Sequence, residues 1–239
     1  MLKTHARTRH VSLVGLALIL TSGSALAACG SGPSGPSAQS VLTLATKDAS
    51  AQKWVHEVRV ESAPGYSLKG ANFIGLTSES QKIVVNGSHA AIIVLPDTAY
   101  VKGDKTAITS FFGIKTKHPA TLAGKWIAIK SSNAAYATLS AAATLVKHFA
   151  EYTVIGPLSE GSDVTIDGQK ALPISGHIAG QNKTSIKATM YVTTSGVVLP
   201  IELLIKEGTA ISTTTWSGWG HAVKILAPAT SVPFSIVSG

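Results

Sequence analysis

The stretch Trp54-Val55-His56-Glu57-Val58-Arg59-Val60-Glu61 alternates two kinds of side chain along its length. Its even-numbered positions carry tryptophan, histidine and two valines, whereas its odd-numbered positions carry a valine, two glutamates and an arginine. Side chains of an extended chain point alternately to opposite sides, so a repeat of two predicts a β-strand. We therefore expect residues 54–61 to form a strand with one buried and one solvent-facing side.

The same short repeat continues along most of the chain that follows. Pairs of turn-forming residues separate the runs, among them Asn86-Gly87, Pro96-Asp97, Asp167-Gly168 and Ser195-Gly196. Consecutive short strands joined by tight turns predict an antiparallel meander. The further strands are expected at residues 67–76, 82–85, 90–95, 99–102, 125–130, 152–156, 162–166, 170–178, 187–193, 198–206, 210–216 and 223–226.

Two or three helices are expected to interrupt the strands, at residues 40–50, 104–112 and 132–151. The first of them places on one face Val41, Leu44 and Ala45. The third is rich in alanine, the best helix former, and it repeats apolar residues at helical spacing. These are Ala135, Leu139, Ala142, Val146 and Phe149. Such a helix either packs solidly against a sheet or covers a cavity in it. The pattern predicts an α+β domain dominated by one large antiparallel sheet.

The N-terminal region has the three parts of a secretory signal. Basic residues at the start precede the apolar run Val11–Leu20, which is too short to span a membrane, and small residues follow. The sequence Leu26-Ala27-Ala28-Cys29 resembles the bacterial lipobox, in which the cysteine is lipidated and becomes the mature N-terminus. The alternative is an ordinary secreted protein with an incidental thiol. The resemblance implies that Cys29 attaches the protein to membrane lipid on the extracytoplasmic face of the cell membrane.

The predicted organisation is a signal peptide at residues 1–28, a tether at 29–39 and a folded domain at 40–239. The tether is almost entirely Gly, Ser and Pro, a composition typical of flexible linkers. Removing residues 1–28 takes away three of the 20 basic residues and none of the 12 acidic ones, so the net charge falls from +8 to +5. Because the remaining lysines are scattered and Arg59 is the only arginine left, we expect no nucleic-acid binding.

Catalysis is not expected either. The sequence contains no Gly-x-Ser-x-Gly elbow, no His-Glu-x-x-His helix and no P-loop. Its histidines are dispersed without the spacing of three or four residues that a local metal site favours. Acidic residues are few, although folding could bring two of them together. We therefore expect no metal, no cofactor and a monomeric protein.

Several short motifs resemble the exported actinobacterial lipoproteins of the LppX and LprG type, whose fold is related to the LolA and LolB lipoprotein carriers. These motifs are Gly124-Lys125-Trp126 before a strand, Asp167-Gly168 in a hairpin, the segment Tyr191–Ile201 and the segment Trp216–Pro228. The likeness extends over most of residues 40–235. It implies a curved half-barrel sheet with helices over the concave side, which holds the acyl chains of a lipid or lipoprotein.

This resemblance predicts a non-catalytic protein that binds or carries an acylated ligand. An apolar cavity under a small-residue helix suits that function, because each buried methylene contributes about 0.8 kcal/mol. The alternative function is a cell-surface module or adhesin that binds a protein partner through exposed sheet edges. The candidate cavity residues are Phe111, Phe112, Trp126, Leu139, Val146, Phe149, Met190 and Val192.

Overall fold

The computed structural model describes residues 36–141, 143–150, 152–179 and 185–237. The predicted signal peptide, Cys29 and most of the tether lie outside the described residues, as does Ala142. From Ser37 onward the chain forms one compact unit. This unit contains two separate clusters of buried apolar side chains, so residues 37–239 have the cores they need to fold by themselves.

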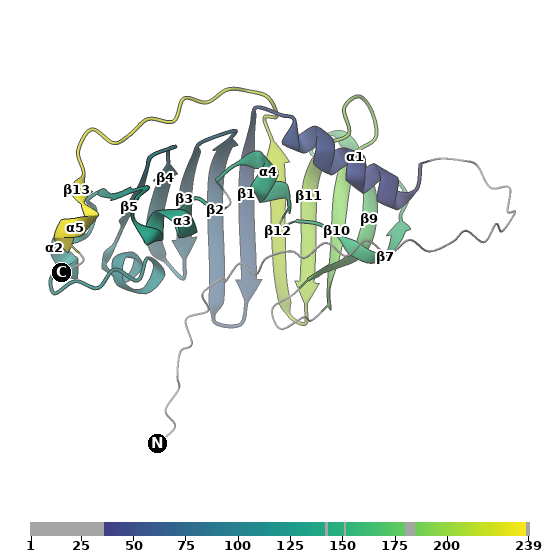
Figure 1. Cartoon of the computed structure of the whole chain (residues 1–239). Coiled ribbons are helices and arrows are strands. Elements are labelled where there is room, and N and C mark those ends of the chain that lie inside the picture. The colour runs from purple at the N-terminus through teal and green to yellow at the C-terminus, as the bar shows by residue number, and fades with distance from the viewer. Residues whose placement is uncertain (1–35, 142, 151, 180–184, 238–239) are drawn as a thin grey trace, which may run out of the picture. The chain divides into compact units, whose positions relative to one another are not determined.

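A single thirteen-stranded sheet dominates this unit (Figure 1). Along the sheet the strands follow the order β13-β6-β5-β4-β3-β2-β1-β12-β11-β10-β9-β7, and β8 also pairs with β9. Neighbours are antiparallel except β13 and β6, which are parallel. The strands are β1 (Trp54–Ala63), β2 (Tyr66–Gly75), β3 (Glu79–Val85), β4 (Ser88–Val94), β5 (Thr98–Gly103), β6 (Ile127–Lys130), β7 (Ile155–Glu160), β8 (Val164–Ile166), β9 (Gln169–Ala179), β10 (Ser185–Thr193), β11 (Pro200–Glu207), β12 (Ala210–Ser217) and β13 (Val232–Pro233).

The sheet is curved and does not close, which confirms the predicted α+β half-barrel. Its helices are α1 (Ala38–Ser50), the π-helical turn η1 (Ala107–Phe111), α2 (Pro119–Leu122), α3 (Ala134–Leu139), α4 (Leu145–Ala150) and α5 (Phe234–Val237). Helices α1 and α4 pack with the core over β9–β12 and the start of β1. The turn η1, α2 and α3 pack with the second core, over β3–β6.

Both cores lie on the same side of the sheet, because residues paired in register across antiparallel strands share a face. Val55 pairs with Ile74, and Ile74 pairs in turn with Glu79. Glu79 then pairs with Val94, a member of the second core. We call this side the helix-covered face and the opposite side the open face.

The less apolar side of β1 is the one that lies under the helices. The helix-covered face receives the odd-numbered residues, and Val55 and Glu57 are each only 1% exposed. Val58 and Val60 point to the open face, where Val60 is 42% exposed. Glu57 is therefore buried, whereas Val60 on the same strand is partly exposed. The hydrogen bonds of Glu57, described below, are the reason.

The predicted helix at residues 132–151 is wrong, because the chain forms two short helices there. Helix α3 ends at Leu139, and α4 begins at Leu145. Ala143, in the connection, is buried in the core over β3–β6, whereas Leu145 is buried in the core beneath α1. A straight helix could not bury Ala143 and Leu145 in different cores, so tertiary packing overrides the helical propensity of the alanines.

The predicted strand at residues 223–226 is also wrong. After β12 the chain has no helix or strand until Val232 and crosses to the far edge of the sheet (Figure 1). Strand β12 already has β1 and β11 as neighbours, so no free edge is available beside it. The chain therefore forms its last strand, β13, only where β6 offers an unpaired edge.

The turn η1 packs so closely on β5 that Gly103 has no room for a side chain. A Cβ atom on Gly103 would lie 2.5 Å from Cβ of Ala107 and 3.0 Å from the carbonyl oxygen of His89. We expect Gly103→Ala to lower the free energy of unfolding by about 1–3 kcal/mol, as overpacking does. Urea denaturation of the purified protein measures this change.

Gly70 on β2 provides the matched control. It faces the same side of the sheet, and an added Cβ would have no neighbour closer than 3.8 Å. Gly70→Ala should therefore leave the urea midpoint nearly unchanged. Equal destabilisation by the two substitutions would contradict the close approach of η1 to β5.

Candidate functional site

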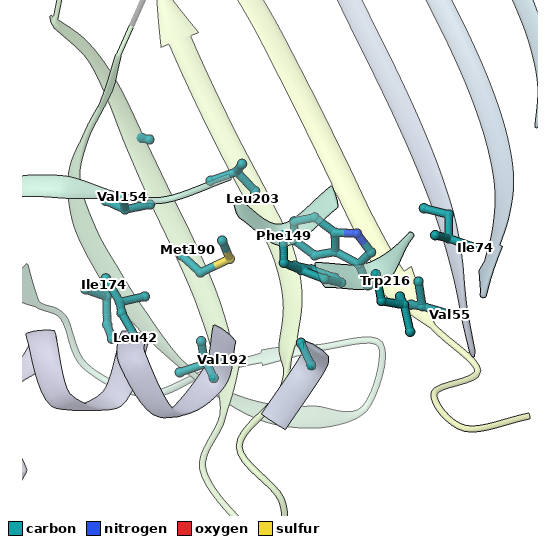
Figure 2. Close-up of a cluster of buried hydrophobic side chains, with 14 residues drawn as sticks. Leu42, Val55, Ile74, Phe149, Val154, Ile174, Met190, Val192, Leu203 and Trp216 are labelled. Atoms are coloured by element: carbon teal, nitrogen blue, oxygen red, sulfur yellow. The ribbon is translucent and has the colours of Figure 1, made fainter. Parts of the chain in front are cut away.

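The core beneath α1 and α4 is built from aromatic and aliphatic side chains that meet over β9–β12 and the start of β1 (Figure 2). Phe149 of α4 packs against the indole rings of Trp216 and Trp219, with ring centroids 5.3 and 5.4 Å apart. Tyr152 contacts the same Trp216 edge to face at 5.4 Å. Helix α4 is thus seated on the end of β12 by aromatic contacts.

A buried polar group lies directly beside this aromatic cluster. The carboxylate of Glu57 accepts hydrogen bonds from Asn72 Nδ2 at 2.8 Å and from Trp216 Nε1 at 3.0 Å. His148 Nε2 lies 2.5 Å from the same carboxylate. These partners come from β2, β12 and α4, so Glu57 links two neighbouring strands and the helix above them.

Such an arrangement is stabilising only when it is complete. A buried carboxylate is costly unless its oxygens are hydrogen-bonded, and a bond to a charged acceptor contributes about 1.5–3 kcal/mol. His148 is 5% exposed, so its bond to Glu57 is shielded from water. Helix α4 is therefore fixed in position by a directional polar contact as well as by packing.

Further polar side chains follow Glu57 along the helix-covered face. Arg59 forms an ion pair with Glu61. Burial alone would lower the pKa of Arg59, but nearby Tyr152, Glu61 and Glu57 outweigh it and raise the pKa, so Arg59 stays cationic. Within the described residues, Asn72 Oδ1 and Thr214 Oγ1 are buried without a hydrogen-bond partner. The middle of this face is thus polar, with an apolar core on either side.

A pocket of about 360 Å³ opens between α1 and the sheet. One wall is the side of α1 from Gln39 to Ser50, and the other is formed by α4, β10, β11 and the residues before β7. The apolar side chains around it are Leu42, Ala45, Phe149, Val154, Met190 and Pro200. The polar side chains that complete the lining are Gln39, Thr43, Thr46, Lys47, Ser50, Tyr152 and Thr153. The pocket therefore offers an apolar wall for an apolar group and a polar side along α1.

The structure brings two of the eight candidate cavity residues to this pocket, Phe149 and Met190. Val192 is fully buried in the core beside it. Phe112 and Leu139 pack against the other core, over β3–β6. Two more are largely exposed, Phe111 at 44% and Val146 at 61%. The eighth, Trp126, lines a groove on the open face.

Sequence reasoning missed the wall that α1 supplies. The predicted apolar face of residues 40–50 is displaced, because Leu42, Ala45 and Ala49 are buried whereas Leu44 is 42% exposed. The spacing of Leu42, Ala45 and Ala49 is itself helical, so this face could have been found. The lining residues Tyr152 and Val154 lie in a predicted strand that begins only at Ile155.

Two classes of feature are not found in the described residues. No group of three or more His, Cys, Asp or Glu side chains is placed to hold a metal ion there. None of the helices described is long and apolar enough to cross a membrane.

The fold is shared with solved structures of mycobacterial proteins. LprF from Mycobacterium bovis superposes with a TM-score of 0.55 and 16% identity, covering 81% of this chain and 97% of that one. The chain has the fold of LprF. Lipoprotein LppX from Mycobacterium tuberculosis superposes on this chain with a TM-score of 0.51 and 15% identity, covering 78% of this chain and 97% of that one. The expected LppX-type fold is thereby confirmed. No protein-family model and no curated protein matches the sequence.

The contact between Glu57 and His148 can be measured as a coupling energy. We expect Glu57→Gln and His148→Phe to be non-additive by about 1–3 kcal/mol in the free energy of unfolding. His148→Phe removes the bond, and Glu57→Gln weakens it by replacing one of the two acceptor oxygens with an amide donor. Urea denaturation of the two single variants and the double variant gives the value.

His177 on β9 serves as the control for this cycle, since β9 lies four strands from β1 in the sheet. Glu57→Gln combined with His177→Phe should be additive within about 0.5 kcal/mol. Additivity in the His148 cycle as well would show that Glu57 does not hold α4.

Proposed function

We propose that this protein is a membrane-anchored, extracytoplasmic lipoprotein that binds an acylated, hydrophobic ligand and catalyses no reaction. The observation that carries the proposal is the apolar pocket between α1 and the sheet. Its volume of about 360 Å³ is within the range of about 300–1,000 Å³ typical of small-molecule sites. The resemblance to lipoproteins of the LppX and LprG type supports the same ligand class.

An acyl chain suits the walls of this pocket. Leu42, Phe149 and Met190 present aliphatic, aromatic and thioether surfaces. Methionine adapts its shape to irregular ligands, and each methylene moved from water into such surroundings contributes about 0.8 kcal/mol. Binding therefore needs no strong polar anchor inside the pocket.

Helix α1 is the wall best able to move. Its buried contacts come from Leu42, Ala45 and Ala49, of which two are alanines with little area to bury. Helix α4 is held in addition by the bond from His148 to Glu57. Because α1 is attached mainly by modest apolar contacts, its displacement costs less, and a longer chain is accommodated by opening on the α1 side.

The proposed anchor lies close to this helix in the sequence. Cys29 precedes the first residue of α1, Ala38, by nine residues. A Gly/Ser/Pro linker of this length reaches roughly 15–30 Å. Lipidation at Cys29 would thus keep α1 and its pocket near the membrane that supplies or receives the ligand.

Filling the pocket tests the ligand site. Thr46 lines it from the exposed side of α1, and Thr46→Trp should occupy the volume without disturbing the core. We expect residues 37–239, expressed in a lipid-containing host, to carry a bound lipid in native mass spectra and in organic extracts. Thr46→Trp should lose most of that lipid.

Leu44→Trp is the matched control, since Leu44 is exposed on α1 and does not line the pocket. It should retain the lipid. A wild-type protein without any bound lipid would overturn the proposed function and favour a module that binds a protein partner. Equal loss from both variants would place the ligand elsewhere.

Replacing Cys29 tests the anchor. In the full chain, Cys29→Ala removes the only thiol in the sequence, so the protein should lose acylation and move from the membrane to the soluble fraction. Fractionation with metabolic labelling by palmitate measures both effects. Membrane retention equal to that of the wild type would contradict lipid anchoring.

A further inference from the structure

The open face of the sheet carries a groove of about 860 Å³, larger than the pocket beneath α1. Its floor crosses β1–β4 and consists of small and branched apolar side chains, Val58, Val60, Ala71, Val84 and Ala91. Register pairs Val58 with Ala71 across β1 and β2, so these residues share the open face. The loop before β6 closes one end, with Gly124 held to β5 by a hydrogen bond from its N–H to the Gly103 carbonyl at 2.8 Å.

Cationic side chains surround this apolar floor. Lys69 of β2, Lys82 of β3 and Lys102 of β5 all line the groove. Lys82 pairs in register with Ala71 on one side and Ala91 on the other, which places its stem within the apolar row. The Nζ atom of Lys102 lies 5.7 Å from the centre of the Trp126 ring, a cation–π contact at the closed end.

The positive charge of these lysines is not neutralised within the described residues. None of the three forms an ion pair there. Asp104 also lines the groove, but its carboxylate oxygens accept bonds from the Ser88 hydroxyl and from the N–H groups of His89 and Ala107. That carboxylate is committed to holding β4 and η1 together. The groove therefore combines an apolar floor with unpaired cations.

We propose that this groove is a second ligand site, which binds a single-chain anionic amphiphile. The acyl chain would lie on the valines and alanines, and a phosphate or carboxylate headgroup would meet Lys69, Lys82 and Lys102. Charge complementarity and the apolar floor together define this ligand class. The site does not depend on the pocket beneath α1, because the two open on opposite faces of the sheet.

Two other occupants fit the groove less well. A bilayer surface would need large apolar side chains that protrude, whereas this floor consists of valines and alanines with lysines and Trp126 beside them. An added peptide strand would need an unpaired sheet edge, but β1–β5 each have a neighbour on both sides. A single chain with an anionic head satisfies both the shape and the charge.

Trp126 supplies a local probe of binding. Lysophosphatidylglycerol with a brominated acyl chain, added below its micelle concentration to residues 37–239, should quench tryptophan fluorescence. Trp126→Phe should abolish most of the quenching, because Trp216 and Trp219 lie against Phe149 on the other face and Trp54, at the start of β1, does not line the groove. Lysophosphatidylcholine with the same chain should bind more weakly, and added salt should reduce the difference.

Charge reversal tests the headgroup contacts. Lys69→Glu with Lys82→Glu should weaken binding of the anionic lipid about tenfold, through the loss of two ion pairs and the repulsion that replaces them. The matched control is Lys187→Glu with Lys206→Glu, a register pair on β10 and β11 with the same change in net charge. It should leave the affinity within about twofold, because these lysines lie outside the groove.

Three results would overturn this second site. One is the absence of quenching below the micelle concentration. Another is equal weakening by both lysine pairs, which would indicate net charge alone. The last is quenching that persists in Trp126→Phe and disappears in Thr46→Trp, because the lipid would then lie beneath α1. That outcome would support lipid binding in the pocket beneath α1 and would exclude the groove as a lipid site.

Discussion

The carboxylate of Glu57 is the contact on which the helix-covered face depends. It lies in the sheet interior at 1% exposure, and every strong donor around it comes from a different element: Asn72 on β2, Trp216 on β12 and His148 on α4. A buried charge must be completely satisfied, so these elements have little freedom to shift relative to β1. The same requirement explains why β1 buries a glutamate and leaves Val60 on the open face.

Several features of the molecule follow from this fixed point. Helix α4 must place His148 above Glu57, and the chain before α4 must place Ala143 in the second core. The alanine-rich segment therefore breaks between Leu139 and Leu145. Helix α1 then packs beside α4 with small apolar contacts. Helix α4 is therefore held by a hydrogen bond, whereas α1 is held mainly by apolar contacts. We expect the pocket to open on the α1 side. None of the described helices packs with the open face over β1–β4, so the lysine-rimmed groove is left uncovered by them.

Most strands were predictable because their signals are local. Alternation in residues 54–61 and turn pairs such as Asn86-Gly87 and Asp167-Gly168 indicated the meander, and Asn86 and Asp167 indeed adopt positive φ angles of 49° and 47°. The helix and strand predictions that are wrong concern segments whose structure depends on contacts with residues far away in the sequence. The break between α3 and α4 reflects two cores, and residues 223–226 lack a strand because β12 has no free edge. Of the candidate cavity residues, the sequence could indicate an apolar character but not which core, pocket or surface would receive each one.

We propose that the ligand enters beneath α1 while α4 stays bonded to Glu57 through His148. Hydrogen exchange of residues 37–239, compared between lipid-loaded and lipid-free protein, tests this directly. We expect the amides of α1, residues 38–50, to gain protection on loading and those of α4, residues 145–150, to remain unchanged. Protection changes in α4 as large as those in α1 would contradict it, because α4 would then be a moving part of the site.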